Sequence, residues 1–269
     1  MDDRTSGRAR ARSTPHPHHR TSVIAHRGAS RAERENTVLA FRRAREMGAD
    51  AVELDVRRCA TGELVVCHDP CLVPRADLPA DVPLLTEALD ACAPMWVNVE
   101  IKNDPSEPDF DPDETVARDV AAVLTARPEP IDRWIVSSFR RETTDALHRL
   151  APAIPIAWLC VALPGAERPT DGDTGIDRDT GIARDTARDA TLVALVRDGY
   201  AALHPWVGAL TRDLVDACHA HGLAVNTWTC DDPTRITELA AWGVDGICTN
   251  VPDLALATLA ASRAGCQSS

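Results

Sequence analysis

The sequence has almost no lysine and few aromatic residues. Lys102 is its single lysine beside 28 arginines, and Phe, Trp and Tyr together make up 4% of its 269 residues. It also has no basic excess, because 29 basic residues stand against 41 acidic ones and give a net charge of −12. Nucleic acids and anionic lipid surfaces select clustered positive charge, so we expect neither as a partner.

No apolar stretch approaches the roughly 18 residues of a membrane span, and residues 1–21 contain no apolar run typical of a secretory leader. The nine cysteines include no CxxC pair, and several lie inside apolar runs, where cysteine behaves as a small hydrophobe. We therefore expect a reduced, cytoplasmic protein without stable membrane insertion. Its ends are expected to be a disordered basic tail over 1–21 and a short tail over 263–269. The sequence does not indicate the oligomeric state.

Short β-type runs alternate with helical patterns over residues 22–262, which is typical of βα units around a parallel sheet. Eight of each in this length predict a single-domain (β/α)8 TIM barrel. The expected strands are 22–26, 51–56, 95–101, 134–138, 154–161, 200–204, 224–229 and 245–249. The expected helices are 36–47, 84–93, 115–126, 142–150, 191–197, 211–221, 233–241 and 254–261.

Two segments do not fit the simple repeat. Residues 64–68 predict a short extra strand after the second barrel strand, in a hairpin or broken loop at the barrel mouth. Residues 164–188 repeat Asp-Thr-Gly and Arg-Asp-Thr units with few apolar residues, and we expect a mobile, low-complexity insertion there. A doubly wound open sheet is the alternative fold, but its first turn needs a glycine-rich loop, and the chain offers Gly28 alone.

Ionisable residues gather where the first strands are expected to end, which is the catalytic face of a barrel. Residues two apart on a strand point to the same face, so the carboxylates of the second and third barrel strands should converge on the barrel axis. Three carboxylates without a thiolate favour a hard cation, either Mg²⁺ or Ca²⁺. Basic groups around them would suit an anionic phosphate, and two imidazoles would suit proton transfer. The residues are His26, Arg27, Glu53, Asp55, His68, Glu100 and Lys102.

The run over 25–70, AHRGASRAERENTVLAFRRAREMGADAVELDVRRCATGELVVCHDP, resembles the glycerophosphodiester phosphodiesterase family, which carries HRG, ENT, an E-x-D pair and HD at these spacings. The likeness continues in VEIK, SSF, NTWT and GVDGICTN and covers nearly all of the chain from Ser22. It implies a metal-dependent barrel enzyme that hydrolyses a small glycerophosphodiester to glycerol 3-phosphate and an alcohol.

The resemblance also implies roles for individual residues. His26 and His68 match the acid/base pair, and Glu53, Asp55 and Glu100 match the ligands of one divalent cation. Arg27 and Lys102 match phosphate-contacting groups, and Trp228 matches an aromatic packed on the substrate. Glu35 and Asn36 match the ENT element, where Glu35 would steady Arg27 or the metal shell and Asn36 would cap the helix to Met47.

Some positions depart from the family pattern and leave other readings open. Arg34 stands where Pro often precedes ENT, and the expected Leu-x-Arg-Thr-Thr after His68 is absent. These departures leave the shape of the alcohol pocket open. The alternatives are a lysophospholipase D- or sphingomyelinase D-like enzyme on lipids, or a non-catalytic glycerophosphate-binding barrel. The mouth loops expected from the sequence are polar, which favours the soluble substrate. The sequence does not decide whether the nucleophile is water or a substrate hydroxyl. It also does not decide whether His204 has a structural role or contacts the substrate.

Overall fold

The structure is a computed structural model of the chain and describes residues 20–163 and 178–266. Within these residues, parallel strands run in the order β1-β9-β8-β7-β6-β5-β4-β2, and pairing of β1 with β2 closes the sheet into a barrel. The predicted (β/α)8 barrel is confirmed. Its strands are β1 (Ser22–His26), β2 (Ala51–Arg58), β4 (Trp96–Ile101), β5 (Trp134–Ser138), β6 (Ile156–Cys160), β7 (Tyr200–Pro205), β8 (Ala224–Thr227) and β9 (Gly246–Thr249).

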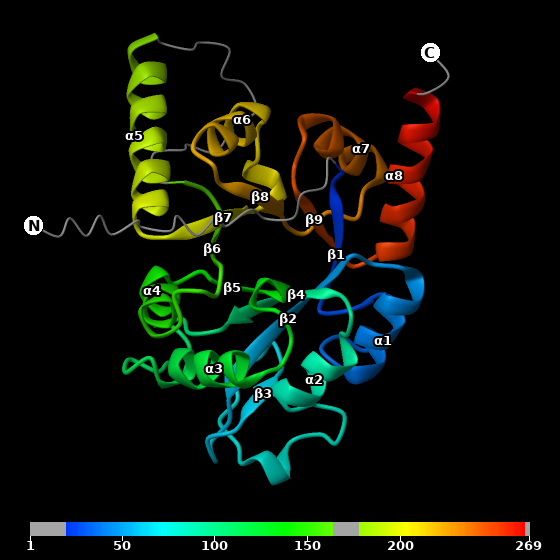
Figure 1. Cartoon of the computed structure of the whole chain (residues 1–269), viewed down its shortest axis with the longest axis vertical. Helices are drawn as coiled ribbons and strands as arrows, with labels where there is room; N and C mark the ends of the chain where they lie inside the picture. The colour runs from blue at the N-terminus through cyan, green and yellow to red at the C-terminus, as the bar shows by residue number, and fades with distance from the viewer. Residues whose placement is uncertain (1–19, 164–177, 267–269) are drawn as a thin grey trace, which may run out of the picture.

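The helices surround the barrel, and neighbouring pairs such as α3 with α4 and α7 with α8 pack on one another (Figure 1). Short 3₁₀ turns precede several elements. The helices are α1 (Val38–Met47), α2 (Leu85–Ala91), α3 (Thr115–Ala126), α4 (Arg141–Leu150), α5 (Arg178–Arg197), α6 (Arg212–Ala220), α7 (Pro233–Trp242) and α8 (Pro252–Cys266), and the turns are η1 (Arg75–Asp77), η2 (Ile131–Arg133) and η3 (Val207–Ala209).

The expected extra strand is β3 (Leu64–Val66), which pairs antiparallel with β2 outside the barrel. It ends before the predicted residue 68, so His68 lies on a loop. Helix α5 begins at Arg178 and therefore occupies the last part of the expected 164–188 insertion, while α8 continues past 262. The remaining tail and insertion residues, 1–19, 164–177 and 267–269, lie outside the described residues.

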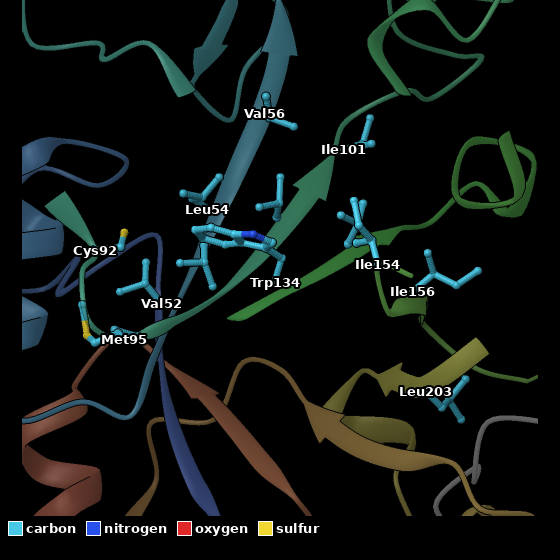
Figure 2. Packing of buried hydrophobic residues seen from close by; sticks show 14 of the residues in the cluster. Val52, Leu54, Val56, Cys92, Met95, Ile101, Trp134, Ile154, Ile156 and Leu203 are labelled. Carbon is cyan, nitrogen blue, oxygen red and sulfur yellow. The ribbon is translucent and has the colours of Figure 1, made fainter. Parts of the chain in front are cut away.

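The main hydrophobic core lies between the barrel strands and the helices. Alternate residues of β2, Val52, Leu54 and Val56, face outward into this core and are fully buried. Trp134, at the start of β5, packs among them (Figure 2). Because side chains alternate along a strand, the intervening Glu53 and Asp55 point to the barrel interior. A smaller apolar cluster, Ile135, Ala157, Ala202 and Ala224, is buried on neighbouring strands.

Candidate active site

Three carboxylates meet inside the barrel near the carboxyl ends of β2 and β4. Glu53 and Asp55 lie on β2, and Asp55 is the register partner of Glu100 on β4. One oxygen from each side chain lies within 4.8 Å of the others, and none of the three residues is more than 7% exposed. The convergence expected from the two-residue spacing is therefore present.

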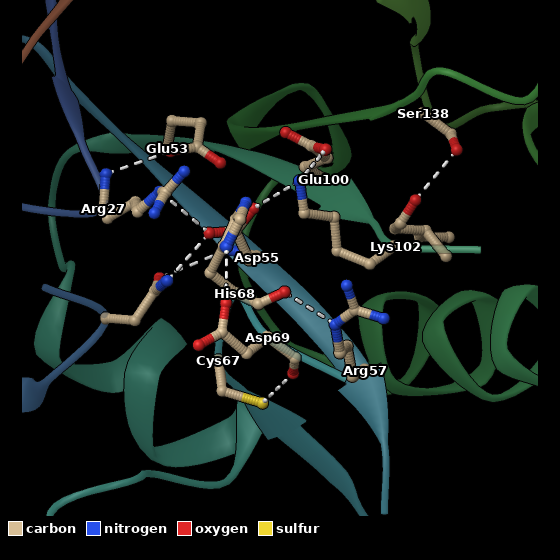
Figure 3. Close-up of polar contacts among 12 residues, drawn as sticks. Arg27, Glu53, Asp55, Arg57, Cys67, His68, Asp69, Glu100, Lys102 and Ser138 are labelled. Atoms are coloured by element: carbon tan, nitrogen blue, oxygen red, sulfur yellow. Dashed lines mark hydrogen bonds and ion pairs between the residues drawn. The ribbon is translucent and has the colours of Figure 1, made fainter. Parts of the chain in front are cut away.

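Two cations flank Asp55 from opposite sides (Figure 3). Arg27 Nε lies 3.2 Å from Asp55 Oδ2, and Lys102 Nζ lies 3.3 Å from Asp55 Oδ1 and 2.7 Å from Glu100 Oε1. Burial by itself would raise the pKa of Asp55, but Lys102 and Arg27 outweigh it and bring that pKa below its usual value. Asp55 is thus the carboxylate that stays ionised most readily.

Glu53 and Glu100 are left with more negative charge around them than the cations balance. Burial, followed by the nearby carboxylates, raises the pKa of Glu53 well above its usual value. Burial and Asp55 raise the pKa of Glu100 to about 7. Glu53 Oε2 accepts from the Arg27 backbone N–H at 2.9 Å, whereas the buried Oε1 has no hydrogen-bond donor among the described residues. Together with carboxylate oxygens of Asp55 and Glu100, Glu53 forms a set of oxygen ligands that fits a hard divalent cation.

The turn after β1 places Arg27 over these carboxylates. Arg27 and Gly28 both adopt left-handed backbone conformations, with φ of 56° and 81°. A Cβ at Gly28 would lie 2.7 Å from the backbone of Ala40, so only glycine lets the turn approach α1 this closely. The next turn supports Arg27 from outside, because Glu35 Oε1 accepts from its guanidinium at 2.8 Å.

Asn36 has a different role from the helix cap expected from the sequence. Thr37 caps α1, since its hydroxyl accepts from the backbone N–H of Ala40. Asn36 is instead buried with φ of 57°, and its side-chain N–H donates to Asp55 Oδ2 at 2.8 Å. Within the ENT turn, Asn36 therefore supports the carboxylate cluster, while Thr37 caps the helix.

His26, at the end of β1, is oriented by residues that follow β9 and β8. Its Nδ1 lies 2.7 Å from Asn250 Oδ1, and the Asn250 amide N–H donates to Asp231 Oδ2 at 2.8 Å. Asp231 fixes which side of the amide faces His26, so Nδ1 carries the hydrogen and Nε2 is the acceptor. Nε2 lies 4.0 Å from Glu53 Oε2, and burial lowers the pKa of His26. The neutral imidazole presents a lone pair beside the carboxylate cluster.

His68 lies on the loop after β3, on the same side of the barrel. Its Nδ1 is 3.0 Å from Asp69 Oδ1, and its backbone carbonyl accepts from Arg57 Nε at 2.8 Å. Arg57 is buried and also pairs with Asp109 and Glu107 in the loop after β4. It thereby ties the His68 loop to the barrel.

Both histidines, both cations and the two glutamates, Glu53 and Glu100, line a cavity of about 180 Å³. Its opposite wall carries no ionised side chain among the described residues. Trp228 and Phe139 meet edge to face there with ring centres 5.4 Å apart, and Trp228 Nε1 donates to the His204 carbonyl at 2.8 Å. His204 is buried, bonds Asn226 at 2.9 Å, and burial lowers its pKa to about 3, so it is neutral.

The mouth loops are less polar than the sequence suggested. Large apolar side chains at the carboxyl ends of β3, β5, β6 and β7 are exposed to solvent, which corrects the expectation of polar loops. Apolar side chains of this size are more often buried in a core. The exposed residues are Leu72, Val73, Phe139, Val161 and Trp206.

Several residues of the site were missed by the sequence analysis. Asn98 and Asn226 line the cavity and stand two residues before Glu100 and Trp228, so the strand alternation could have identified both. Arg57 stands two residues after Asp55 and could have been found in the same way. Asn250 ends the GVDGICTN motif, but its pairing with His26 joins opposite ends of the chain and could not be predicted from local sequence.

This fold and this arrangement of groups are those of a (β/α)8-barrel phosphodiester hydrolase. A comparison with family models refines the class: the model of the glycerophosphoryl diester phosphodiesterase family matches residues 26–78 and 72–254. The chain belongs to that family, and the enzyme class expected from the sequence is confirmed.

Curated relatives and solved structures agree with this assignment. The chain is 27% identical to the glycerophosphodiester phosphodiesterase of Caldanaerobacter subterraneus subsp. tengcongensis over 87% of this chain and 96% of the relative. It is 26% identical to the enzyme of that name from Bacillus subtilis (strain 168), over 87% and 85%. An Oleispira antarctica phosphodiesterase, solved with its product sn-glycerol-3-phosphate, shares the fold with a TM-score of 0.73 at 22% identity, over 90% of this chain and 97% of that one.

Proposed function

We propose that the protein hydrolyses small glycerophosphodiesters to glycerol 3-phosphate and an alcohol with the help of one divalent cation. The observation that carries the proposal is the buried carboxylate trio, with the unpartnered Glu53 Oε1, set between two cations and two histidines. The Oleispira antarctica relative, which was solved with sn-glycerol-3-phosphate, supports the same product class.

Glu53, Asp55 and Glu100 would hold the cation, either Mg²⁺ or Ca²⁺, since their oxygens suit both. When bound, it supplies a positive charge that polarises a phosphoryl oxygen. Arg27 and Lys102 would contact the remaining phosphate oxygens. Burial opposes their charge, but the neighbouring carboxylates raise the pKa of both groups, so both remain cationic.

The two histidines would divide the proton transfers. His26 Nε2 accepts the proton of the attacking hydroxyl while the new P–O bond forms. The ester P–O bond to the alcohol breaks, and His68 donates a proton to the leaving oxygen. Asn250 and Asp231 suit His26 to the first role because they keep its Nε2 unprotonated. The attacking hydroxyl belongs to water or to the glycerol moiety, and a cyclic phosphate intermediate would indicate the second.

The test is release of glycerol 3-phosphate from glycerophosphocholine and glycerophosphoethanolamine by purified protein, with Mg²⁺, Ca²⁺ or EDTA. We expect release with a cation, none with EDTA, and a large loss in His26→Ala. His221→Ala is the matched control, because His221 follows α6 at the end of the barrel opposite the mouth. Tight binding of glycerol 3-phosphate without turnover of any diester would instead support the non-catalytic barrel.

A lipid diester is a second candidate substrate because of the exposed apolar side chains around the mouth. None of the helices in residues 20–163 and 178–266 has the length and apolar character that crossing a bilayer requires. Faster turnover of micellar lysophospholipids than of glycerophosphoethanolamine would favour this candidate.

A further inference from the structure

A second cavity, of about 360 Å³, opens directly beside the catalytic one. It lies between the turn over residues 34–37 and the segment over 66–82, and we call it the outer groove. His68 lines both cavities, so the outer groove adjoins the proposed reaction centre at this residue. Its lining is mainly apolar and includes Val66, Pro70, Leu72, Val73, Leu78, Pro79 and Val82.

The floor of the outer groove is a small packed core of its own. Cys71 and Val82 are buried there together with Cys59 and Val65, in a cluster separate from the main core. Leu72, next to Cys71, is 58% exposed and Val73 is 42% exposed. The groove therefore has an ordered apolar floor and an apolar rim, and exposed apolar surface of this kind gains free energy when a ligand covers it.

The charged side chains that line the outer groove all have partners. Arg34 pairs with Asp81 at 2.7 Å, Glu35 with Arg27 at 2.8 Å, and His68 with Asp69 at 3.0 Å. Arg34 and Glu35 are thus balanced by opposite charges, and the exposed carboxylate of Asp69 lies beside the His68 imidazole. Most of the other lining residues are apolar.

The outer groove is also held in place at both ends. Arg34 joins the 34–37 turn to Asp81 on the opposite wall. At the inner end, Asp109 accepts from the Cys71 backbone N–H at 2.9 Å and pairs with Arg57, which holds the His68 carbonyl. A preformed groove loses little conformational freedom when it binds a ligand.

We propose that the outer groove binds the alcohol moiety of the substrate and gives the enzyme a preference for apolar alcohols. This inference rests on the proposed function. The catalytic cavity, with Asn98, Asn226 and Trp228, would take the glycerol phosphate. The ester oxygen to the alcohol would then lie at His68, and the alcohol would continue along Leu72 and Val73.

The experiment compares two soluble diesters, the n-butyl ester of glycerol 3-phosphate and glycerophosphoethanolamine. Both release an unactivated primary alcohol, so they differ mainly in the group that the groove would contact. We expect kcat/KM for the butyl ester to be roughly tenfold higher, the size typical of an apolar pocket that recognises a few methylenes. An equal value, or a higher one for the ethanolamine ester, would overturn the inference while leaving the proposed function standing.

Variants test whether the preference for the butyl ester arises from the outer groove. Leu72→Asp should lower kcat/KM for the butyl ester about tenfold more than for the ethanolamine ester. Leu150→Asp is the control, because Leu150 is 57% exposed at the end of α4, away from the mouth, and should leave the ratio unchanged. An equal loss with both esters in Leu72→Asp would contradict the inference.

Two further outcomes separate the causes of failure. A preference for apolar alcohols that appears only when a dodecyl ester forms micelles would overturn the inference. It would indicate that the enzyme acts at a lipid surface and does not bind the alcohol in the outer groove. No release of glycerol 3-phosphate from any diester would overturn the proposed function and this inference with it.

Discussion

The two walls of the catalytic cavity have opposite chemistry. The wall built by β1, β2 and β4, which we call the charged wall, carries the carboxylates and both cations. The wall built by β5, β7 and β8, the uncharged wall, presents Phe139, His204, Asn226 and Trp228. We infer that the first half of the barrel holds the reacting phosphate and the second half recognises the polyol beside it.

The charges of the charged wall depend on one another. Asp55 stays ionised because Lys102 and Arg27 outweigh the effect of burial, and these cations stay charged because carboxylates surround them. The uncharged wall has no such partners, and burial alone lowers the pKa of His204 to about 3. A charge is therefore tolerated on one wall and excluded from the other, and four variants test this contrast.

The largest effect is expected from His26→Ala, on the charged wall. Loss of a positioned proton acceptor typically lowers kcat roughly 10²–10⁴-fold. Steady-state release of glycerol 3-phosphate measures it, with His221→Ala as the matched control. Full activity in His26→Ala would remove the proposed role.

Glu53→Gln should lower kcat by roughly 10²–10³-fold and weaken cation binding, because it removes a charged ligand from the carboxylate cluster. In EDTA, the same variant should be more stable than the wild type, since it removes a buried carboxylate that Asp55 and Glu100 repel. Calorimetric titration with Mg²⁺ and urea unfolding measure the two effects. Glu46→Gln, on the surface of α1, is the control. Unchanged cation affinity in Glu53→Gln would contradict the metal assignment.

His204 should make the uncharged wall sensitive to acid. Its pKa is about 3 in the folded protein and roughly 6.5 when unfolded, so the unfolded chain binds more protons between these values. Its contribution to stability is then complete above pH 6.5 and falls as the pH drops toward 3, with a loss of about 2 kcal/mol at pH 5. Urea unfolding at pH 5 and pH 8 should show this loss relative to His204→Gln. A difference between the two proteins that does not change with pH would exclude it.

The smallest effect is expected from Trp228→Ala, which removes the aromatic surface of the uncharged wall. A binding contact of this kind is worth roughly tenfold in KM, with a smaller change in kcat. Trp228→Phe should recover most of the loss because the ring remains. Trp242→Ala, at the end of α7, should leave KM unchanged, although Trp242 packs against the main core. A fall in kcat at unchanged KM would give Trp228 a part in the chemistry instead.

The charged wall was more predictable from the sequence than the uncharged one. Glu53 and Asp55 stand out because carboxylates on an apolar strand need a partner, and the alternation of strand residues places them on one face. On the uncharged wall, Asn226 and His204 are residue types that occur anywhere. Strand alternation predicts the face that they share with neighbouring residues, but the closed barrel brings this face to the cavity. The Asn250 contact with His26 depends on the same closure.

The outer groove was also beyond local sequence patterns. The segment after His68 contains prolines and short polar stretches, which predict a loop but not its shape. Its apolar floor arises because Cys71 and Val82 reach Cys59 and Val65 on other segments. The start of α5 was misplaced because the Asp-Thr-Gly and Arg-Asp-Thr units contain too few apolar residues to indicate a helix, although residues 178–197 form one.

The anchoring of the His68 loop by Arg57 and Asp109 has a consequence for redesign. These two side chains hold the main chain at His68 and at Cys71, so both ends of the segment 68–71, which joins the catalytic cavity to the outer groove, are anchored. We therefore expect that exchanging the stretch from Leu72 to Asp81 for another loop would leave His68 in place. The preference for the leaving alcohol could thus be changed through this loop while the barrel keeps the catalytic residues in place.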